Sequence, residues 1–389
     1  MLGALLYWWL LDASAGLPSY LREGSNDLSI YRQAGEAILR GEIPYRDFFI
    51  EYPPGSLPAF VPPALFSTDA KGYTSLFSSE MALALVATLL LTALAARKMW
   101  GPWYWAVPAA TLAASAILLY PVAVTRYDAV VALALALAVY GAALGGRYVL
   151  LAYAALGFGA AAKLVPALAT VPLALARGRA LRGYAAFLGV LALFLAPTLL
   201  LGGAAFLGSF AYHADRGLQV ESLAASVLMQ LDQVSEVTFA YGAFEVRGRG
   251  VELASSLSLP VTGALLLVTA FFVYREHRSG RFGLRAFPRY AAALILAFML
   301  SSKVLSPQYV IWLLPLVPLS ARGVAQLGLS AVFLAVCWTT TRVYPVHYDD
   351  LLSLQPPGPE LLLARNLLLA GLWVLLLLLP ESAREKTSP

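Results

Sequence analysis

The stretch NDLSIYRQAGEAILRGEIPYRDFFIEYPP (Asn26–Pro54) is polar, although the chain around it is strongly apolar. Its charged residues are Asp27, Arg32, Glu36, Arg40, Glu42, Arg46, Asp47 and Glu51. Because loops often carry function, we expect this polar stretch, which directly follows the first apolar segment, to take part in chemistry or ligand contact. The plainer alternative is a solvated connecting loop.

The polar stretch also contains a predicted helix. Apolar residues recur at helical spacing between Ile30 and Leu39. The pattern predicts an amphipathic helix along the membrane surface, with Asp27 as its N-cap. Gly41 is the predicted end of this helix, and the prolines that follow predict an extended or turned path.

The composition predicts an all-α, polytopic helical membrane protein. Hydrophobic residues make up 60% of the 389 residues and charged residues 13%, against about 25% charged in soluble proteins. The apolar runs are long, which favours membrane helices over a β-barrel. We expect a single membrane domain over residues 1–389 with about 11–13 spans, since one span needs about 20 residues.

The apolar runs place the expected spans along the chain. The first run lacks the basic start and cleavage site of a signal peptide and is interpreted as a short first span. Residues 55–66 are broken by prolines and are expected to be re-entrant or interfacial. The expected spans cover residues 2–17, 73–96, about 103–121, 129–144, two between 147 and 176, 183–201, 257–274, 290–302, 309–319, 323–340 and 361–379.

The positive-inside rule then sorts the loops. The basic loops and both termini are expected in the cytoplasm. The loops assigned to the other face include a first extracytoplasmic loop at 18–66 and a large one at 202–256, with shorter ones at 125–128, around Lys163, at 303–308 and at 341–360. These outer loops hold nearly all the acidic residues, so the candidate chemistry lies on the extracytoplasmic face.

Soluble-enzyme motifs and dedicated metal motifs are absent from the sequence. The chain has three histidines, His213, His277 and His347, and His277 falls on the cytoplasmic side of the predicted topology. The single Cys337 lies in an apolar run, so no disulfide framework is expected. The basic residues lie in short loops and set orientation, so no nucleic-acid partner is expected. We expect no cofactor and no metal site, while a divalent metal requirement stays open.

Isolated cations at membrane depth are the strongest pointers to chemistry. Arg126, Lys163 and Lys303 are each the only cation of a short turn, on the same predicted face as Asp27. Charges there are costly and usually functional. Such cations suit a lipid-linked phosphate, and the carboxylate suits a general base. The alternative for each cation is snorkelling to the interface or pairing with an acid such as Asp128.

Four later motifs follow the polar stretch in order: TRYD (Thr125–Asp128), KLVP (Lys163–Pro166), YHADRGLQVES (Tyr212–Ser222) and SKVLSPQYVIWLLPL (Ser302–Leu316). This ordered set resembles the polyprenol-phosphate-mannose-dependent mannosyltransferases of the GT-C class. The chain is most similar to glycosyltransferase family 87, with a weaker similarity to the first mannosyltransferase of GPI-anchor synthesis. The resemblance implies a GT-C bundle of membrane helices.

The resemblance also implies residue roles. Asp27 would be the catalytic base. Contacts to the donor phosphate or sugar would come from Arg126, Lys163, Lys303, Gln308 and Tyr309, and contacts to the acceptor or bracing of the loops from Glu51, Tyr52, Asp128, His213, Arg216 and Glu221. This chain has Asn26 before its single Asp27, where several members of the class carry paired acidic residues. That departure weakens a metal-binding role for the motif.

The expected activity is transfer of a hexose, most simply mannose, from a polyprenyl phosphate carrier to an extracytoplasmic hydroxyl. The acceptor would be a glycan, a glycolipid or a protein, and a single displacement would invert the anomeric centre. One alternative is a multi-spanning transporter or flippase for lipid-linked sugars, although the sequence has no evident matched halves. A non-catalytic subunit of a polysaccharide assembly complex is a further alternative.

Overall fold

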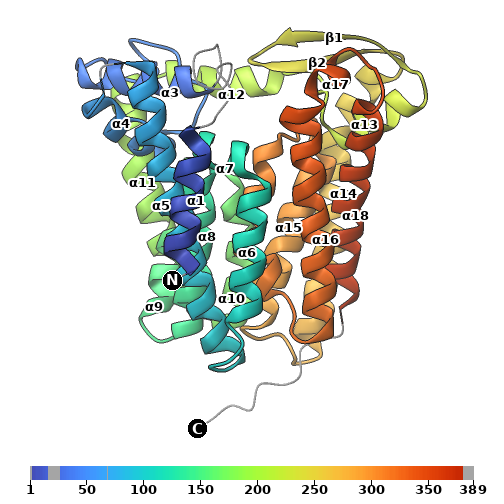
Figure 1. Ribbon diagram of the computed structural model, residues 1–389. Helices are drawn as coiled ribbons and strands as arrows, with labels where there is room; N and C mark the ends of the chain where they lie inside the picture. Colours follow the sequence, from blue (N-terminus) through green and yellow to red (C-terminus); the bar gives the residue numbers. More distant parts are fainter. Residues whose placement is uncertain (1, 16–26, 68, 380–389) are drawn as a thin grey trace. The chain divides into compact units, whose positions relative to one another are not determined.

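A computed structural model describes residues 2–15, 27–67 and 69–379 (Figure 1). Apart from one β-hairpin, the regular structure of these residues is helical, which confirms the expected helical membrane fold. The chain divides into two compact units. The first unit comprises residues 1–170 and 179–214, and the second comprises residues 171–178 and 215–389.

The first unit is a bundle built around the 31-residue helix α5. Helix α5 packs against α8, α8 against α9, and α9 against α11. The elements of this unit are α1 (Leu2–Ala15), α3 (Asp27–Leu39), η1 (Pro54–Ala59), α4 (Val61–Leu65), α5 (Ala70–Trp100), α6 (Ala106–Leu118), α7 (Tyr120–Thr125), α8 (Asp128–Leu144), α9 (Tyr148–Ala162), η2 (Val165–Ala169), α11 (Ala180–Gly202) and α12 (Ala205–Asp215). Buried alanines on α8 and α9 let these two helices approach closely.

The second unit contains residues 171–178 and most of the C-terminal half of the chain. Its elements are α10 (Thr170–Arg177), α13 (Leu223–Gln230), β1 (Val234–Ala240), β2 (Ala243–Gly248), α14 (Val251–Arg278), α15 (Ala286–Ser301), η3 (Pro307–Leu313), η4 (Val317–Leu319), α16 (Val324–Thr341), η5 (Arg342–Val346), α17 (Tyr348–Leu352) and α18 (Gly358–Leu378). Helix α18 packs against α13, α15, α16 and α17. The first residue of α10 belongs to the other unit.

A helix is present where the spacing predicts one: α3 begins at Asp27 and ends at Leu39. Gly41 follows it with a φ of 84°, a left-handed conformation that glycine adopts readily. The prolines downstream break residues 54–65 into the short helices η1 and α4, as expected of a segment too short to span. In Figure 1, α3 and α4 lie at one end of α5.

Two sequence-based boundaries differ from the structure. Residues 202–256 were expected to be an outer loop, yet they hold α12, α13 and an antiparallel β-hairpin, and α14 begins within them at Val251. The hairpin forms because β-branched and aromatic residues flank a turn at Tyr241–Gly242, where both residues have positive φ. The expected span at 309–319 consists of the 3-10 segments η3 and η4, because three prolines in residues 307–318 remove backbone N–H donors.

Five helices of the described chain are long and apolar enough to cross a membrane. They are α5, α11, α14, α18 and the continuous stretch Val324–Val346. Six further apolar helices have 10–17 residues. The breaks around Lys163 and Pro166, predicted as a turn between two short spans, appear as the end of α9 and the 3-10 segment η2.

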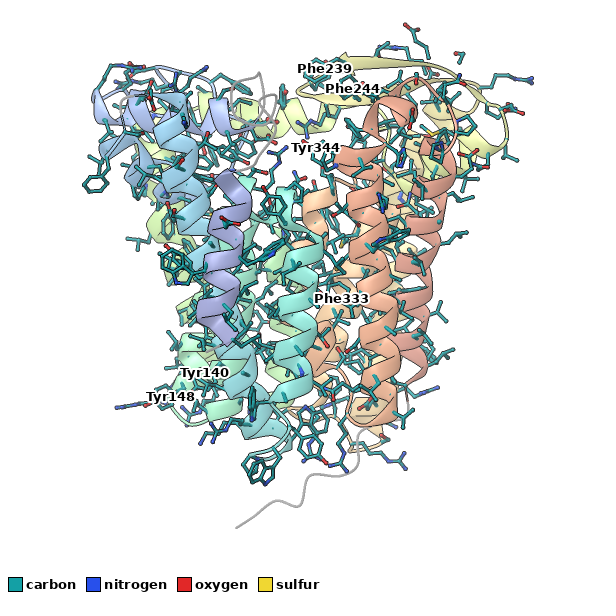
Figure 2. All side chains as sticks on the ribbon, in the orientation of Figure 1. Tyr140, Tyr148, Phe239, Phe244, Phe333 and Tyr344 are labelled. Carbon is teal, nitrogen blue, oxygen red and sulfur yellow. The ribbon has the colours of Figure 1, made fainter. Side chains whose placement is uncertain are left out.

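Labelled aromatic residues show which elements lie at the ends of each unit (Figure 2). In the first unit, Tyr148, which follows Arg147 at the start of α9, lies at the opposite end of the bundle from α3 and α4 (Figure 2). In the second unit, Phe239 and Phe244 of the hairpin mark one end, and Phe333 lies midway along α16 (Figure 2).

Gly35 sets how closely α3 can approach the segment after η1. A Cβ atom added at Gly35 would fall far inside van der Waals distance of the Phe60 carbonyl oxygen and 3.1 Å from the Cβ of Ala64. Backbone atoms cannot yield as a flexible side chain does, so even alanine would push α3 outward.

We expect Gly35→Ala to destabilise the protein by about 1–3 kcal/mol, the usual cost of overpacking a core. Gly189→Ala in α11 is the matched control, because a Cβ there meets no atom within 4 Å. Thermal unfolding of the two purified variants, followed by intrinsic fluorescence, measures the difference. Equal unfolding temperatures would contradict this account of the α3 contact.

Candidate active site

An ion pair between α3 and the turn before α8 forms the centre of the candidate site. Arg126 Nε lies 2.8 Å from Asp27 Oδ2. The Tyr52 hydroxyl donates a hydrogen bond to the other carboxylate oxygen of Asp27. The Asp27 side chain is 26% exposed and that of Arg126 is 9% exposed. Asp27 is therefore held on both oxygens yet remains open on one side.

The second ion pair lies on the adjoining turn. Lys163 Nζ is 2.8 Å from Asp128 Oδ1, and the Asp128 side chain is almost fully buried. The same ammonium lies 4.9 Å from the centre of the Tyr127 ring. Since Arg126, Tyr127 and Asp128 are consecutive, one turn supplies groups to both ion pairs.

Local backbone structure explains why the two cations occur here. Arg126 is extended, with φ −126° and ψ 136°, because it links the short helix α7 to α8. Lys163 is also extended, because it ends α9 before the proline-containing segment η2. Gly55 brings the turn after Tyr52 onto this end of α9, where an added Cβ would clash with the backbone of Ala161 and Ala162.

A cluster of aromatic rings packs next to the residues of the two ion pairs. The ring of Tyr31 stacks on Phe60 at 4.3 Å and lies 5.2 Å from Tyr52 and 5.8 Å from Tyr127. Phe77 of α5 contacts Tyr31 at 5.3 Å. Rings at these separations attract one another and leave little freedom to move. The cluster therefore fixes the Tyr52 hydroxyl, and with it the Asp27 carboxylate.

The environment also keeps Tyr52 protonated. Burial raises the pKa of the Tyr52 hydroxyl well above its ordinary value, and the negative charge of Asp27 raises it further. At neutral pH this hydroxyl is therefore a hydrogen-bond donor to Asp27. Its proton is too tightly held for Tyr52 to serve as a base.

The second unit holds other residues to which the sequence assigned roles. Lys303 Nζ donates to the carbonyl oxygen of Arg216, and the Arg216 guanidinium donates to the carbonyl of Tyr241 at 2.7 Å. Gln308 and Tyr309 lie in η3, where the Tyr309 ring stacks on Trp312 at 4.2 Å. All of these residues belong to the second unit.

Glu221 of the second unit is a buried partner of helix α18. Its Oε1 accepts from Arg365 Nη1 at 3.2 Å, and its backbone carbonyl accepts from Arg365 Nη2 at 2.6 Å. Asn366 adds bonds to Ser226 and to the backbone of residues 221 and 222. Sequence reasoning assigned no role to Arg365 and Asn366, although a charged and an amide side chain inside an apolar span were a visible signal.

Of the residues predicted from sequence, the first unit thus brings together Asp27, Tyr52, Arg126, Asp128 and Lys163. Glu51 is half-buried beside Tyr52. His213 belongs to α12, and its side chain lies outside the described part of the chain.

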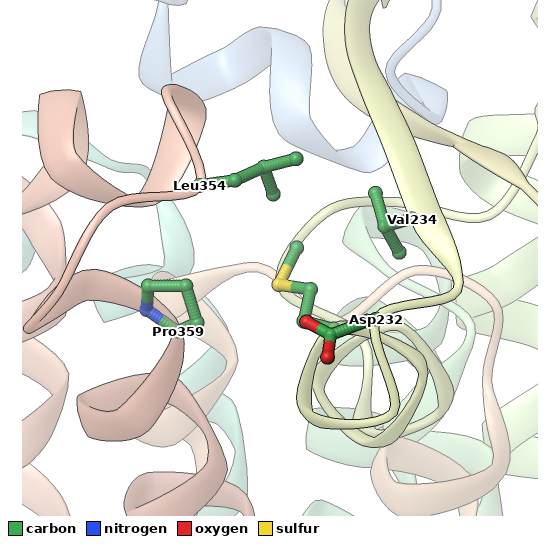
Figure 3. Close-up of a pocket in the computed structure, with 5 residues that line it drawn as sticks. Asp232, Val234, Leu354 and Pro359 are labelled. Atoms are coloured by element: carbon green, nitrogen blue, oxygen red, sulfur yellow. The ribbon is translucent and has the colours of Figure 1, made fainter.

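The second unit also contains a small cavity, and the described residues of the chain contain no cluster of potential metal ligands. Among the described residues, no three His, Cys, Asp or Glu side chains gather as they would around a metal ion. A cavity of about 120 Å³ in the second unit is lined by Met229, Asp232, Val234, Leu354 and Pro359 (Figure 3). It offers one carboxylate among mainly apolar groups, which is a poor basis for catalysis.

Comparison with known proteins gives one family and one fold. The sequence model of glycosyltransferase family 87 matches residues 49–307. The crystal structure of ArnT from Cupriavidus metallidurans bound to undecaprenyl phosphate is similar with a TM-score of 0.50 at 15% identity, covering 96% of this chain and 75% of that chain. Its apo state gives a TM-score of 0.48 at 14% identity, covering 91% and 72%. No curated protein matched. At such identities the structural similarity shows the fold alone.

We expect Lys163→Met to destabilise the protein by about 3–5 kcal/mol, because the buried Asp128 carboxylate loses the ammonium beside it. Adding Asp128→Asn should restore most of the loss, since the charge that needed neutralising is then gone. Lys98→Met, at an exposed position in α5, is the control. Thermal unfolding of the single and double variants measures this coupling, and equal losses in both would contradict it.

Proposed function

We propose, because this chain belongs to glycosyltransferase family 87, that it transfers mannose from a polyprenyl phosphate carrier to an acceptor hydroxyl. The observation that carries the proposal is the exposed edge of Asp27, held by Arg126 and Tyr52 next to a second cation, the half-buried Lys163. The similarity to an ArnT structure that contains undecaprenyl phosphate supports the choice of a polyprenyl carrier.

In the proposed reaction, Asp27 is the general base. Its carboxylate takes the proton of the acceptor hydroxyl as that oxygen attacks the anomeric carbon of the donor sugar. The new bond joins the acceptor oxygen to the anomeric carbon, and the bond from that carbon to the phosphate oxygen breaks. One displacement inverts the centre, so a β-linked donor gives an α-glycoside.

The leaving group requires positive charge, which Arg126 and Lys163 can supply. Polyprenyl phosphate leaves as an anion, and a guanidinium and an ammonium stabilise phosphate oxygens strongly at a site shielded from water. Arg126 is paired with Asp27, and Lys163 with Asp128. Donor phosphate that draws Arg126 toward itself would therefore loosen the pair and leave Asp27 more available as a base.

The other parts of the proposal rest on the sequence. Lys303, Gln308 and Tyr309 are assigned to the donor by family resemblance, and each is testable by substitution. Placing the site on the extracytoplasmic face, with both termini in the cytoplasm, rests on the distribution of basic loops. We propose that no metal is required, since two protein cations can balance the charge of one phosphate.

Asp27→Asn should lower the transfer rate by about 10²–10⁴-fold, the usual contribution of a general base, while donor binding persists. The measurement is transfer of radiolabelled mannose from polyprenyl phosphate mannose by the purified protein in liposomes. Asp47→Asn, at an exposed position of the polar stretch, is the matched control. Full transfer by Asp27→Asn would place the base elsewhere and contradict the proposal.

Tyr52→Phe should lower kcat by roughly 10-fold and leave the KM for donor unchanged, because one hydrogen bond that orients Asp27 is lost. Tyr148→Phe, at the opposite end of the first unit, controls for removal of a hydroxyl. Steady-state kinetics on both variants give the comparison. A rise in donor KM with constant kcat would assign Tyr52 to donor binding instead.

A further inference from the structure

The first unit contains a cavity between α3 and the chain segment 48–50. Its volume is about 280 Å³, and it is separate from the residues that make the two ion pairs. We call it the α3 cavity. Ala34, Ala37 and Ile50 are buried at its base, whereas Phe49 is 60% exposed at its edge. Its remaining lining residues are Ile30, Gln33, Glu36, Arg40, Glu42 and Phe48.

The charges around the α3 cavity are already balanced. Arg40 Nε lies 2.7 Å from Glu42 Oε1, and Arg32 Nε lies 3.4 Å from Glu36 Oε1. With two carboxylates on its rim and its one lining cation paired, the cavity is poorly suited to a phosphate or another anion. It instead offers carboxylate oxygens, an amide and a guanidinium as hydrogen-bond partners for a neutral ligand.

The shape of the α3 cavity and its apolar groups further restrict the class of ligand that it can bind. Small alanine side chains leave room at the base, and the exposed ring of Phe49 provides a flat apolar wall. A sugar ring has C–H groups that pack on such a wall and hydroxyls around its edge that both donate and accept. A volume of about 280 Å³ is near the lower end of ligand cavities, which suits a sugar unit better than a polypeptide.

Both walls of the α3 cavity lead to the proposed base. On α3, Ile30, Gln33, Ala34 and Ala37 share one stripe, and Asp27 precedes Ile30 by three residues on the neighbouring turn. In the segment 48–50, the buried Ile50 lines the cavity, and two residues later the Tyr52 hydroxyl donates a hydrogen bond to Asp27. A ligand in the cavity is therefore bounded by the same two segments that hold the carboxylate.

We propose that the α3 cavity binds a neutral sugar unit of the acceptor and so presents the acceptor hydroxyl to Asp27. The proposal rests on the proposed transferase function for its meaning, but sugar binding itself does not require catalysis. Phe49 and Gln33 would contact the acceptor, and Arg126 and Lys163 the donor. Acceptor and donor are thereby assigned to different groups of residues within the first unit.

The test separates binding from catalysis. Asp27→Asn protein in lipid nanodiscs, free of glycoside detergent, is titrated with α-mannobiose, cellobiose and octyl α-mannoside, and binding is followed by saturation-transfer NMR. We expect at least one of these probes to bind, and Phe49→Ala and Gln33→Ala to weaken it by roughly 10-fold, the scale of one lost aromatic or hydrogen-bonding contact. Phe66→Ala is the matched control, because Phe66 is 79% exposed and does not line the cavity.

Each result bears on the proposal. Binding of the free disaccharides supports a site for the sugar alone, and binding of octyl α-mannoside only supports a sugar carried on a lipid. Absence of binding by all three probes, or equal binding by the Phe49→Ala and Phe66→Ala variants, overturns the proposal. In the wild-type background, loss of transfer with every donor would overturn the transferase function while the binding result still stands.

Discussion

The ion pair between Asp27 and Arg126 is the interaction on which the rest of the candidate site depends. It joins the first turn of α3 to the turn before α8, so the short helix α3 and a helix of the bundle are linked by one charge pair. The Asp27 carboxylate is largely buried and needs a partner, since an unpaired buried charge is costly. That partner is Arg126, whose guanidinium would also be attracted to a phosphate.

Close packing of small and aromatic residues keeps this pair in place. Gly35 allows α3 to lie against the backbone of Phe60, and Gly55 allows the turn after Tyr52 to lie on the end of α9. Between them, the rings of Tyr31 and Tyr127 fill the space beneath the ion pairs. The surrounding bundle, with its alanine-rich helices, supplies a rigid base for a polar stretch that would otherwise be a solvated loop.

Much of the first unit could be predicted from sequence, and less of the second. Helical spacing and Gly41 located α3, and isolated cations pointed to Arg126 and Lys163, because these signals are local. The pairing of Asp27 with Arg126 is a long-range contact that no local pattern encodes. The hairpin at 234–248 was hidden in a segment expected to be a loop, and the bond from Arg365 to Glu221 joins residues far apart in sequence. The α3 cavity was equally invisible, because it depends on how segment 48–50 folds back against α3.

We propose above all that this chain moves a sugar from a lipid phosphate to an acceptor. The most direct measurement offers purified wild-type protein in sealed liposomes a panel of radiolabelled polyprenyl phosphate sugars, with and without chelator, and determines both the location of the label and the anomeric configuration of the product. The account predicts an α-linked mannosyl product from a β-linked donor, formed equally in the presence of chelator. Movement of intact donor across the bilayer without any transfer would contradict it and indicate a flippase.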